Sequence, residues 1–337
     1  MSDYRKILIF RQSSLGDVVL TLPLIQRLYE SFPNCLIDYI TKSPYAAIIR
    51  CHRAVRKVHS FDGDSEFYRL ARSLNNEKYD LFLDLQLNLR SYALGLLASP
   101  AKIVRYKKRR IAREMVVRRA HLKLAVDQTV NAYFSTLRSL GISGVPSPSF
   151  ISLPNASSEY IENLLRERGL QGKTLIAICP GAKHYEKRWP HSDFKNVALS
   201  LLKQEEIGIV VISSASDEIP IRLGIDHPRL LELRDEAILN VAALFARCRL
   251  ALTNDSGLMH LANAAGTPVL AIFGPTNPRL GFSPILPGSE IICDNVFCSP
   301  CSVHGQKPCC QPEKYCFQKI THQRVVDKLL GMLKTLK

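Results

Sequence analysis

The chain has 337 residues, of which 46% are hydrophobic and 22% charged, and its formal net charge is +15. This length suffices for two domains of ordinary size. No apolar run approaches the roughly 20 residues of a membrane span, and the N-terminus lacks a secretory signal pattern, so we expect a soluble, cytoplasmic protein. Ten cysteines without such a signal predict thiols or metal ligands rather than a disulfide framework.

Short apolar runs alternate with helical patterns along the whole chain, which predicts an α/β fold with mainly parallel sheets. The first half contains predicted strands at residues 6–10, 36–40, 55–61, 81–85 and 102–105, and predicted helices at 18–29 and 127–140. The second half contains predicted strands at 174–179, 207–213, 230–233, 249–252 and 269–273, and a helix at 320–336. The segment 143–149 is rich in Gly, Pro and Ser and separates the two series.

These elements predict two doubly wound Rossmann-like domains. The N-terminal domain covers residues 1–145, and the C-terminal domain covers 146–320 and includes a Cys-rich segment at 293–316. Residues 321–337 form a closing helix. No internal repeat is evident in the sequence, so the predicted likeness of the two halves rests on the alternation of strands and helices.

The corner formed by Asp255, Ser256 and Gly257 lies between two apolar runs and predicts a strand, a tight turn and a helix over 257–265 that ends at Gly266. The unpaired N–H groups of the first helical turn would form an anion site there. The alternative is a purely structural corner without a ligand, because any βαβ unit has a capped corner of this kind.

Two further corners follow the first strand of each half. Arg11-Gln-Ser-Ser-Leu-Gly-Asp17 follows the first strand of the chain, and residues 180–190 follow the strand at 174–179. Loops that leave the carboxyl ends of parallel strands open into the binding crevice of such sheets. Both segments are therefore candidates for contact with a ligand.

Three segments together resemble glycosyltransferase family 9, the ADP-heptose:lipopolysaccharide heptosyltransferases. Residues 255–276 fit its C-terminal signature D-[ST]-G-x-x-H-x-x-x-A-x-x-x-P-x-[IV]-x-x-[FY]-G-P-T, with Leu270 in place of the usual β-branched residue. Residues 11–17 resemble its R-x-S-S-x-G-D signature, and residues 180–190 resemble its P-G-(variable)-K-x-W-P loop. The resemblance spans nearly the whole chain.

The resemblance implies a GT-B fold, in which an acceptor-binding and a nucleotide-sugar-binding domain face a central cleft. It implies an inverting, metal-independent transfer of heptose from ADP-heptose to the inner core of lipopolysaccharide, onto a lipid A-Kdo or heptosyl acceptor. No cofactor is required for this reaction. Two alternatives remain: another nucleotide sugar or acceptor, and a non-catalytic polyanion-binding protein. An NAD-dependent enzyme fits less well, because the first βα turn lacks G-x-G-x-x-G.

Asp17 and Lys187 are the predicted catalytic residues. Transfer to a hydroxyl needs a base on the acceptor side, and Asp17 is the candidate carboxylate. Its alternative role is the N-cap of a helix that begins at Val18. Lys187 would neutralise charge on the departing ADP, and the second half has no Asp-x-Asp pair at a strand end to hold a divalent cation there.

The resemblance also implies donor and acceptor contacts. Predicted donor contacts at the C-terminal corner are Asp255, Ser256, Gly257, Leu258 and His260. Glu218 is the candidate for the ribose hydroxyls, with Asp217 as its competitor. Predicted acceptor contacts are Ser13, Ser14, Gly16, Arg90, Arg109 and Arg113. For Arg90 a structural role stays open.

Ten Lys and Arg residues fall between positions 102 and 123, with apolar residues among them. One interpretation is a solvated basic face. The other is an amphipathic helix on an anionic membrane. The lipid A acceptor that the resemblance implies is itself anionic, so we expect peripheral contact with the inner face of the inner membrane and no nucleic-acid partner.

The Cys-rich segment leaves two interpretations open. Cys298-Ser-Pro-Cys301 has the spacing of a metal-binding knuckle. Cys309, Cys310 or Cys316 would complete a structural site for zinc or an iron-sulfur cluster, and the set we expect is Cys298, Cys301, Cys309 and Cys316. Thiols that only pack within the loop are the alternative. In either case the segment lies beyond the donor corner and has no predicted catalytic role.

Overall fold

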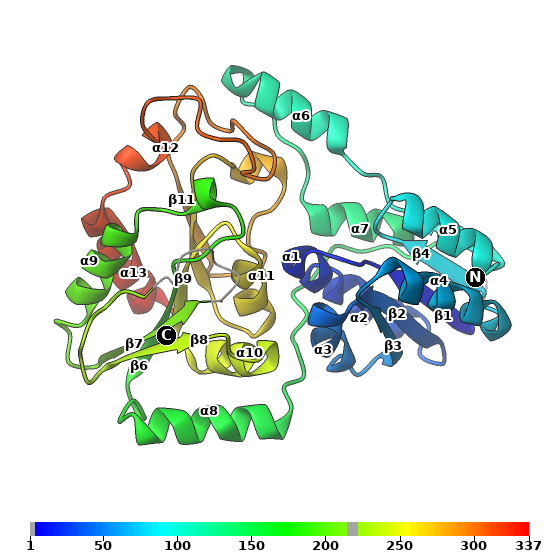
Figure 1. Cartoon of the computed structure of the whole chain (residues 1–337), viewed down its shortest axis with the longest axis horizontal. Coiled ribbons are helices and arrows are strands. Elements are labelled where there is room, and N and C mark those ends of the chain that lie inside the picture. Colours follow the sequence, from blue (N-terminus) through cyan, green and yellow to red (C-terminus); the bar gives the residue numbers. More distant parts are fainter. Residues whose placement is uncertain (1–3, 214–221, 337) are drawn as a thin grey trace. The chain divides into compact units, whose positions relative to one another are not determined.

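A computed structural model of the chain describes residues 4–213 and 222–336. The chain forms two compact units (Figure 1). The N-terminal unit consists of residues 1–109 and 128–152, and the C-terminal unit consists of residues 110–127 and 153–337. No helix within the described residues is long and apolar enough to cross a membrane.

The N-terminal unit is built on a five-stranded parallel sheet with the strand order β3-β2-β1-β4-β5. Its central strands are buried apolar runs, as expected of a parallel sheet covered on both faces. The strands are β1 (Lys6–Phe10), β2 (Leu36–Lys42), β3 (Val55–Phe61), β4 (Leu81–Asp84) and β5 (Lys102–Arg105).

Helices cover both faces of this sheet (Figure 1). One face carries a buried cluster in which Phe10 and Phe82 of the sheet pack with Phe67 of α4 and Leu94 of α5. The helices are α1 (Leu15–Val19), α2 (Leu22–Ser31), α3 (Ser43–Arg50), α4 (Asp64–Ser73), α5 (Leu89–Leu97) and α7 (Thr129–Arg138), with a 3₁₀ turn at Leu74–Glu77.

The C-terminal unit contains a six-stranded parallel sheet with the order β11-β10-β9-β6-β7-β8. Counted from β6, this is the 3-2-1-4-5-6 order of the doubly wound nucleotide-binding fold. The strands are β6 (Thr174–Cys179), β7 (Ile207–Ser213), β8 (Leu230–Arg234), β9 (Leu250–Asn254), β10 (Val269–Phe273) and β11 (Glu290–Cys293).

One face of the second sheet is covered by α9 and α13, whose Phe194 and Leu329 belong to the same buried cluster as Trp189. In Figure 1, α10 and α11 lie on the other side of the strands. The helices of this unit are α6 (Arg110–Arg118), α8 (Asn155–Glu167), α9 (His191–Leu201), α10 (Ile238–Arg247), α11 (Gly257–Ala264), α12 (Tyr315–Gln318) and α13 (His322–Thr335), with 3₁₀ turns at Ala120–Leu122, Tyr185–Lys187 and Pro278–Leu280.

The segment 110–127 packs with the C-terminal unit, although the sequence analysis counted it with the first half of the chain. Val116 and Val126 form a buried cluster with Leu280. The segment approaches Gly281 so closely that a Cβ atom there would lie 2.5 Å from the carbonyl oxygen of Asp127. Gly281 has a φ of +81° and therefore suits both the turn and the close approach.

The predicted α/β class with parallel sheets is confirmed, and most predicted strands agree with the structure to within two residues. The predicted helix at 18–29 is wrong, because the chain forms α1 and α2 with a break at Leu20 and Thr21. Pro23 lies in the first turn of α2, where its missing N–H is tolerated. Strand β11 was not predicted.

Candidate functional site

Both units place the predicted corners at the point where the strand order reverses. In the N-terminal unit the central strands β1 and β4 diverge there, and in the C-terminal unit β6 and β9 do. The loops that leave these strands begin at Arg11, Leu85, Pro180 and Asp255. In open α/β sheets, ligands bind outside the carboxyl ends of strands at such a switch point. Each unit therefore has one candidate site.

Asp17 is the central side chain of the N-terminal corner. Its Oδ2 lies 2.8 Å from the guanidinium of Arg11 and accepts hydrogen bonds from the backbone N–H of Ser14 at 3.3 Å and from its hydroxyl at 3.0 Å. The hydroxyl of Tyr133 donates to Oδ1 at 3.3 Å. The predicted alternative, that Asp17 caps the helix, is wrong in detail: the N-cap is Ser14, and Asp17 is the third residue of α1.

Arg11 is nearly enclosed, with 9% of its side chain exposed against 21% for Asp17. It donates to the carbonyl oxygen of Leu85 at 2.6 Å, and so connects the loop after β1 to the loop after β4. Its guanidinium lies 5.7 Å from the ring centroid of Tyr133 on α7. The sequence motif contains Arg11 but gave it no role, and no sequence signal pointed to Tyr133.

The charge of Arg11 sets the protonation state of Asp17. Burial disfavours the carboxylate form, but the charge of Arg11 and the hydrogen bonds from Ser14 outweigh it and lower the pKa of Asp17 below its ordinary value. Burial also raises the pKa of Tyr133 well above its ordinary value, so its hydroxyl stays protonated. Asp17 is thus a partly exposed carboxylate that is ionised at neutral pH.

The predicted acceptor residues do not all belong to the Asp17 corner. Ser13 is half-buried, Ser14 is exposed and Gly16 is buried, and all three belong to the same corner as Asp17. Arg90 lies instead in the first turn of α5, where it donates to Asp64 at 2.7 Å. The sequence left a structural role open for Arg90, and the ion pair with Asp64 is such a role.

Lys187 and Asp255 form the centre of the C-terminal corner. The Lys187 ammonium lies 2.6 Å from Oδ2 of Asp255, and the exposed fractions of the two side chains are 14% and 8%. The hydroxyl of Thr276 donates to the same oxygen at 2.7 Å. Lys187 is the last residue of the 3₁₀ turn Tyr185–Lys187 in the loop after β6. The Asp255 carboxylate is therefore occupied by protein groups and holds the lysine at the corner.

Helix α11 begins beside this ion pair. Ser256 is its N-cap, and Gly257 is its first residue, as predicted. The Ser256 hydroxyl oxygen is buried and has no hydrogen-bond partner within the described residues. Leu258 is half-buried, and His260 is buried with 5% exposure. Glu218 and its competitor Asp217 lie outside the described residues.

Asn254 and Thr276 are two corner residues that the sequence analysis did not assign. The Asn254 amide donates to the carbonyl oxygen of Pro180 at 2.8 Å and accepts from the backbone N–H of Trp189 at 3.0 Å. It therefore fastens the loop 180–190 to the end of β9. Asn254 could have been found from the sequence as a polar residue at the buried end of an apolar strand. Thr276 could have been found from its place in the family signature.

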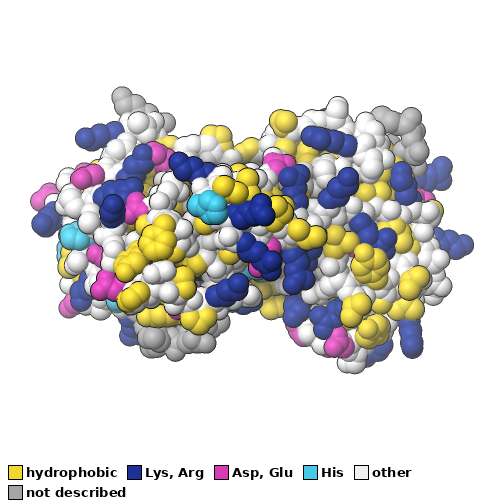
Figure 2. Space-filling view, turned by 90° about the horizontal axis from the view of Figure 1, so that it is seen from above, with side chains coloured by type: hydrophobic (Ala, Val, Ile, Leu, Met, Phe, Trp, Pro, Cys, Tyr) yellow, Lys and Arg dark blue, Asp and Glu magenta, His cyan; other side chains and the backbone are white. Residues whose placement is uncertain are grey.

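The basic residues between 102 and 123 divide between the two units, with those up to Arg109 in the N-terminal unit and those from Arg110 in the C-terminal unit. Lys102 and Arg105 belong to the N-terminal unit, where they bond to Tyr4 and Asp84. Arg113 is 8% exposed, donates to the carbonyl oxygen of Leu280 at 2.9 Å and lies 4.4 Å from the ring centroid of Phe282. Arg109 is half-buried. Figure 2 shows Lys and Arg side chains spread over the displayed face, with Asp and Glu side chains among them.

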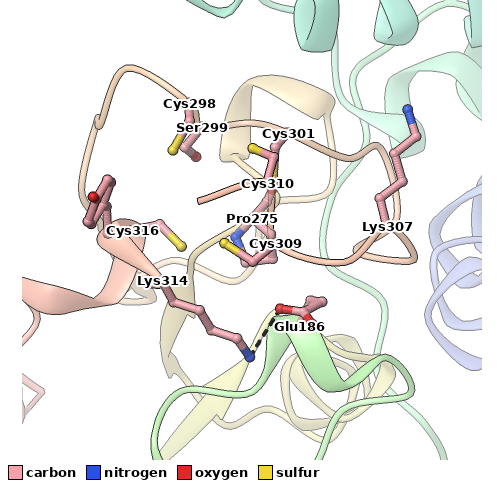
Figure 3. A pocket seen from close by; sticks show the side chains of 11 residues that line it. Glu186, Pro275, Cys298, Ser299, Cys301, Lys307, Cys309, Cys310, Lys314 and Cys316 are labelled. Carbon is pink, nitrogen blue, oxygen red and sulfur yellow. Dashed lines mark hydrogen bonds and ion pairs between the residues drawn. The ribbon is translucent and has the colours of Figure 1, made fainter. Parts of the chain in front are cut away.

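The four cysteines predicted as metal ligands, Cys298, Cys301, Cys309 and Cys316, line one small pocket with Cys310 (Figure 3). Within residues 4–213 and 222–336, however, no group of three or more His, Cys, Asp or Glu side chains is arranged to hold a metal ion. The predicted metal site is therefore not formed.

The thiols of this segment have partners within the protein. Two thiols donate to backbone carbonyl oxygens at 3.7 Å, Cys301 to Pro275 and Cys309 to Glu313. Burial, followed by the neighbouring cysteines, raises the pKa of Cys301 to about 11 and that of Cys316 to about 12. Without a bound metal ion, these two thiols are therefore protonated at neutral pH.

The two switch-point sites define a class of protein. One unit presents an ionised carboxylate at the end of its first strand, and the other presents a lysine beside the N-terminus of a helix in a nucleotide-binding type of sheet. Two Rossmann-like units with these features are those of a GT-B glycosyltransferase, and the predicted fold class is confirmed.

Comparison with known proteins agrees with this class. The family model of glycosyltransferase family 9 (heptosyltransferase) matches residues 67–310, and the chain belongs to this family. It is 29% identical over 297 residues to lipooligosaccharide heptosyltransferase 2 of Haemophilus influenzae, which covers 81% of this chain and 84% of the relative.

Two solved structures share the fold. A glycosyl transferase of family 9 from Veillonella parvula has a TM-score of 0.83 and 20% identity, covering 99% of both chains. The ADP-heptose lipopolysaccharide heptosyltransferase II of E. coli has a TM-score of 0.76 and 22% identity, covering 98% of this chain and 99% of that one. Its membership in the heptosyltransferase family makes the protein a glycosyltransferase, and the non-catalytic alternative is set aside.

Proposed function

We propose that the protein transfers heptose from ADP-heptose to the inner core of lipopolysaccharide, with inversion at the anomeric carbon and without a metal ion. The proposal rests on one observation: one switch point carries an ionised carboxylate, Asp17, and the other carries a lysine beside a helix N-terminus. Membership in the heptosyltransferase family supports the sugar, and the names of the relatives support the donor and the acceptor.

Asp17 acts on the acceptor side. Its carboxylate accepts the proton of the attacking hydroxyl while the acceptor oxygen forms a bond to the anomeric carbon and the bond to the ADP oxygen breaks. Arg11 and Ser14 hold the carboxylate in place and in its ionised form. A base that activates the acceptor for direct attack opposite the leaving group inverts the anomeric configuration. Ser13 and Gly16 shape the same corner for the acceptor.

Lys187 acts on the donor side. Its ammonium compensates the charge that develops on the leaving diphosphate, and the unpaired N–H groups in the first turn of α11 supply further donors. Asp255 orients the lysine, and the buried Ser256 hydroxyl points to a polar group of the donor as its partner. A cation and a helix N-terminus stabilise the diphosphate without a divalent ion. We keep Leu258, His260 and Glu218 as proposed donor contacts.

The exposed face of α6 and the following turn supports peripheral contact with an anionic membrane, at the inner face of the inner membrane. Ile111 is 79% exposed, Met115 42% and Leu122 50%, and the exposed cations Arg110, Arg118, Arg119 and Lys123 accompany them. An apolar stripe flanked by cations suits the surface of an anionic bilayer. Sedimentation with phosphatidylglycerol vesicles, and none with phosphatidylcholine vesicles, would support this contact, and Ile111→Asp should weaken it.

The test of the transfer reaction uses the whole protein, ADP-heptose and a panel of truncated lipopolysaccharides, analysed by mass spectrometry. We expect one acceptor of the panel to gain the mass of one heptose. UDP- and GDP-linked sugars are the matched donors that should give no product. Transfer from one of those donors instead would replace the donor assignment, and a folded protein that modifies no acceptor would contradict the proposed reaction.

A further inference from the structure

Gly305, in the Cys-rich segment, packs directly against the side chain of Lys187. A Cβ atom at position 305 would lie 2.7 Å from Cδ of Lys187 and closer still to Cγ. Gly305 is buried and has a φ of +72°, a conformation that side chains with a Cβ rarely adopt. The backbone of the segment therefore lies directly beside the lysine side chain. A residue with a Cβ atom at position 305 would clash with that side chain.

Hydrogen bonds hold Gly305 in this place. The Ser302 hydroxyl accepts from the backbone N–H groups of Gly305 at 3.0 Å and Gln306 at 3.2 Å. The backbone N–H groups of Cys301 and Ser302 donate to the carbonyl oxygen of Pro275, at 3.0 and 3.3 Å. Pro275 immediately precedes Thr276, whose hydroxyl donates to the partner of Lys187. The segment and the ion pair are thus attached to the same stretch after β10.

A second contact holds the other end of the turn that carries Lys187. The Lys314 ammonium lies 3.2 Å from the Glu186 carboxylate and 4.1 Å from the ring centroid of Tyr185 (Figure 3). Residues 185 and 186 are therefore fixed from the same segment that contacts residue 187. The Cys-rich segment thus contacts all three residues of the 3₁₀ turn.

We propose that Gly305 is a positioning residue for Lys187, and that the Cys-rich segment fixes the lysine in the conformation that meets the leaving diphosphate. This inference rests on the proposed role of Lys187. A lysine side chain has four rotatable bonds, and an ammonium that must find its position during the reaction stabilises the leaving group less than one already in place. Contact along Cγ and Cδ restricts those bonds at the stem, while the ammonium remains at the corner.

The test compares Gly305→Ala with Gly172→Ala. Gly172 has a φ of +79°, and a Cβ there meets nothing within 4 Å, so both variants strain the backbone alike but only one displaces Lys187. We expect both to lower the melting temperature, and Gly305→Ala by the larger amount, because its Cβ also meets the Lys187 stem. Only Gly305→Ala should lower kcat for transfer, by at least tenfold, with KM for the acceptor unchanged. A wild-type kcat in folded Gly305→Ala would overturn the inference.

The same substitution in a Lys187→Ala background separates positioning from general damage. Alanine has no Cγ or Cδ, so Gly305→Ala should cause no further loss of kcat there. An equal loss in both backgrounds would overturn the inference alone and leave the role of Lys187 intact. A wild-type rate in Lys187→Ala by itself would instead overturn that role, and the inference with it.

Ser302→Ala provides a variant that adds no volume, in case Gly305→Ala does not fold. It removes the hydroxyl that accepts from Gly305 and Gln306, and so loosens the turn beside Lys187. We expect a severalfold loss of kcat that disappears in the Lys187→Ala background. Persistence of the loss in that background would contradict the positioning role.

Discussion

The two switch-point corners are built alike but expose opposite charges. Each has an acid and a base in contact, Arg11 with Asp17 at 2.8 Å and Lys187 with Asp255 at 2.6 Å. In the first corner the acid is the more exposed partner, at 21% against 9% for the arginine. In the second corner the lysine is the more exposed partner, at 14% against 8% for the acid.

This difference indicates which partner acts and which one supports it. A buried arginine that also binds the Leu85 carbonyl keeps the first acid ionised, so the acid is available to accept a proton. A buried acid held by Thr276 orients the lysine in the second corner, so the cation is available to an anionic group. In the proposed mechanism, the same arrangement of strands and loops supplies a base in one unit and a charge-stabilising cation in the other.

Asp17→Asn should have the largest effect, because it removes the acting partner of the first corner while preserving its shape. We expect kcat to fall by about 10²–10⁴-fold, the usual contribution of a general base. The measurement is heptose transfer under saturating donor and acceptor. Asp80→Asn is the matched control, since Asp80 binds the N–H groups of Arg5 and Lys6 before the start of β4. A wild-type rate in Asp17→Asn would remove the base assignment.

Lys187→Met should have the next largest effect. Methionine keeps much of the stem that packs beside Gly305 but removes the ammonium, so we expect kcat to fall about 10²-fold or more, as when a preorganised electrostatic contact is lost. Steady-state kinetics with varied donor would measure it. Lys183→Met, at an exposed lysine of the same loop, should keep the wild-type rate. Equal losses in both variants would show that the ammonium of Lys187 has no special role.

Thr276→Val should have a smaller effect, because it removes a supporting contact in the second corner rather than the acting group. Loss of a buried hydrogen bond to a carboxylate costs about 1.5–3 kcal/mol of unfolding free energy, and a lysine held less firmly should lower kcat severalfold. Thr267→Val is the control. Its hydroxyl is equally buried and donates to the Phe245 carbonyl, so stability should fall without a change in kcat.

The sequence was sufficient for the sheets and for the positions of both corners. Strand β10 (Val269–Phe273) is a buried, continuous apolar run and has the bounds that the pattern predicts. Strand β3 (Val55–Phe61) also has the predicted bounds, although it is an edge strand in which Arg56 and Lys57 are exposed. Strand β11 escaped prediction because Glu290–Cys293 is a short edge strand that is largely half-buried and has no strong apolar run. An edge strand of four residues thus offers less sequence pattern than β3, an edge strand of seven residues.

Contacts between distant residues were beyond the sequence. Tyr133 lies 116 residues from Asp17, and Arg113 lies 167 residues from Leu280, so no spacing relates them. For this reason the sequence analysis assigned Asp17 a role but not its partners, and it counted the segment 110–127 with the wrong compact unit. The cysteine spacing suggested metal ligands, but within residues 4–213 and 222–336 the side chains are not arranged in a group that could hold a metal ion.

The smallest expected effect is on stability, and it tests the support that Arg11 gives to Asp17. The folded-state pKa of Asp17 lies below its ordinary value of 3.8, so the ion pair stabilises the native state above that pH. As the pH falls below 3.8 toward the lower folded-state pKa, this stabilisation is lost. Wild-type protein should therefore exceed Asp17→Asn in unfolding free energy at pH 6, and the difference should shrink at pH 3. Urea denaturation of both proteins at each pH measures it. A difference that stays constant between the two pH values would mean that Arg11 does not hold the carboxylate in its ionised form, and the contrast between the two corners would then rest on exposure alone.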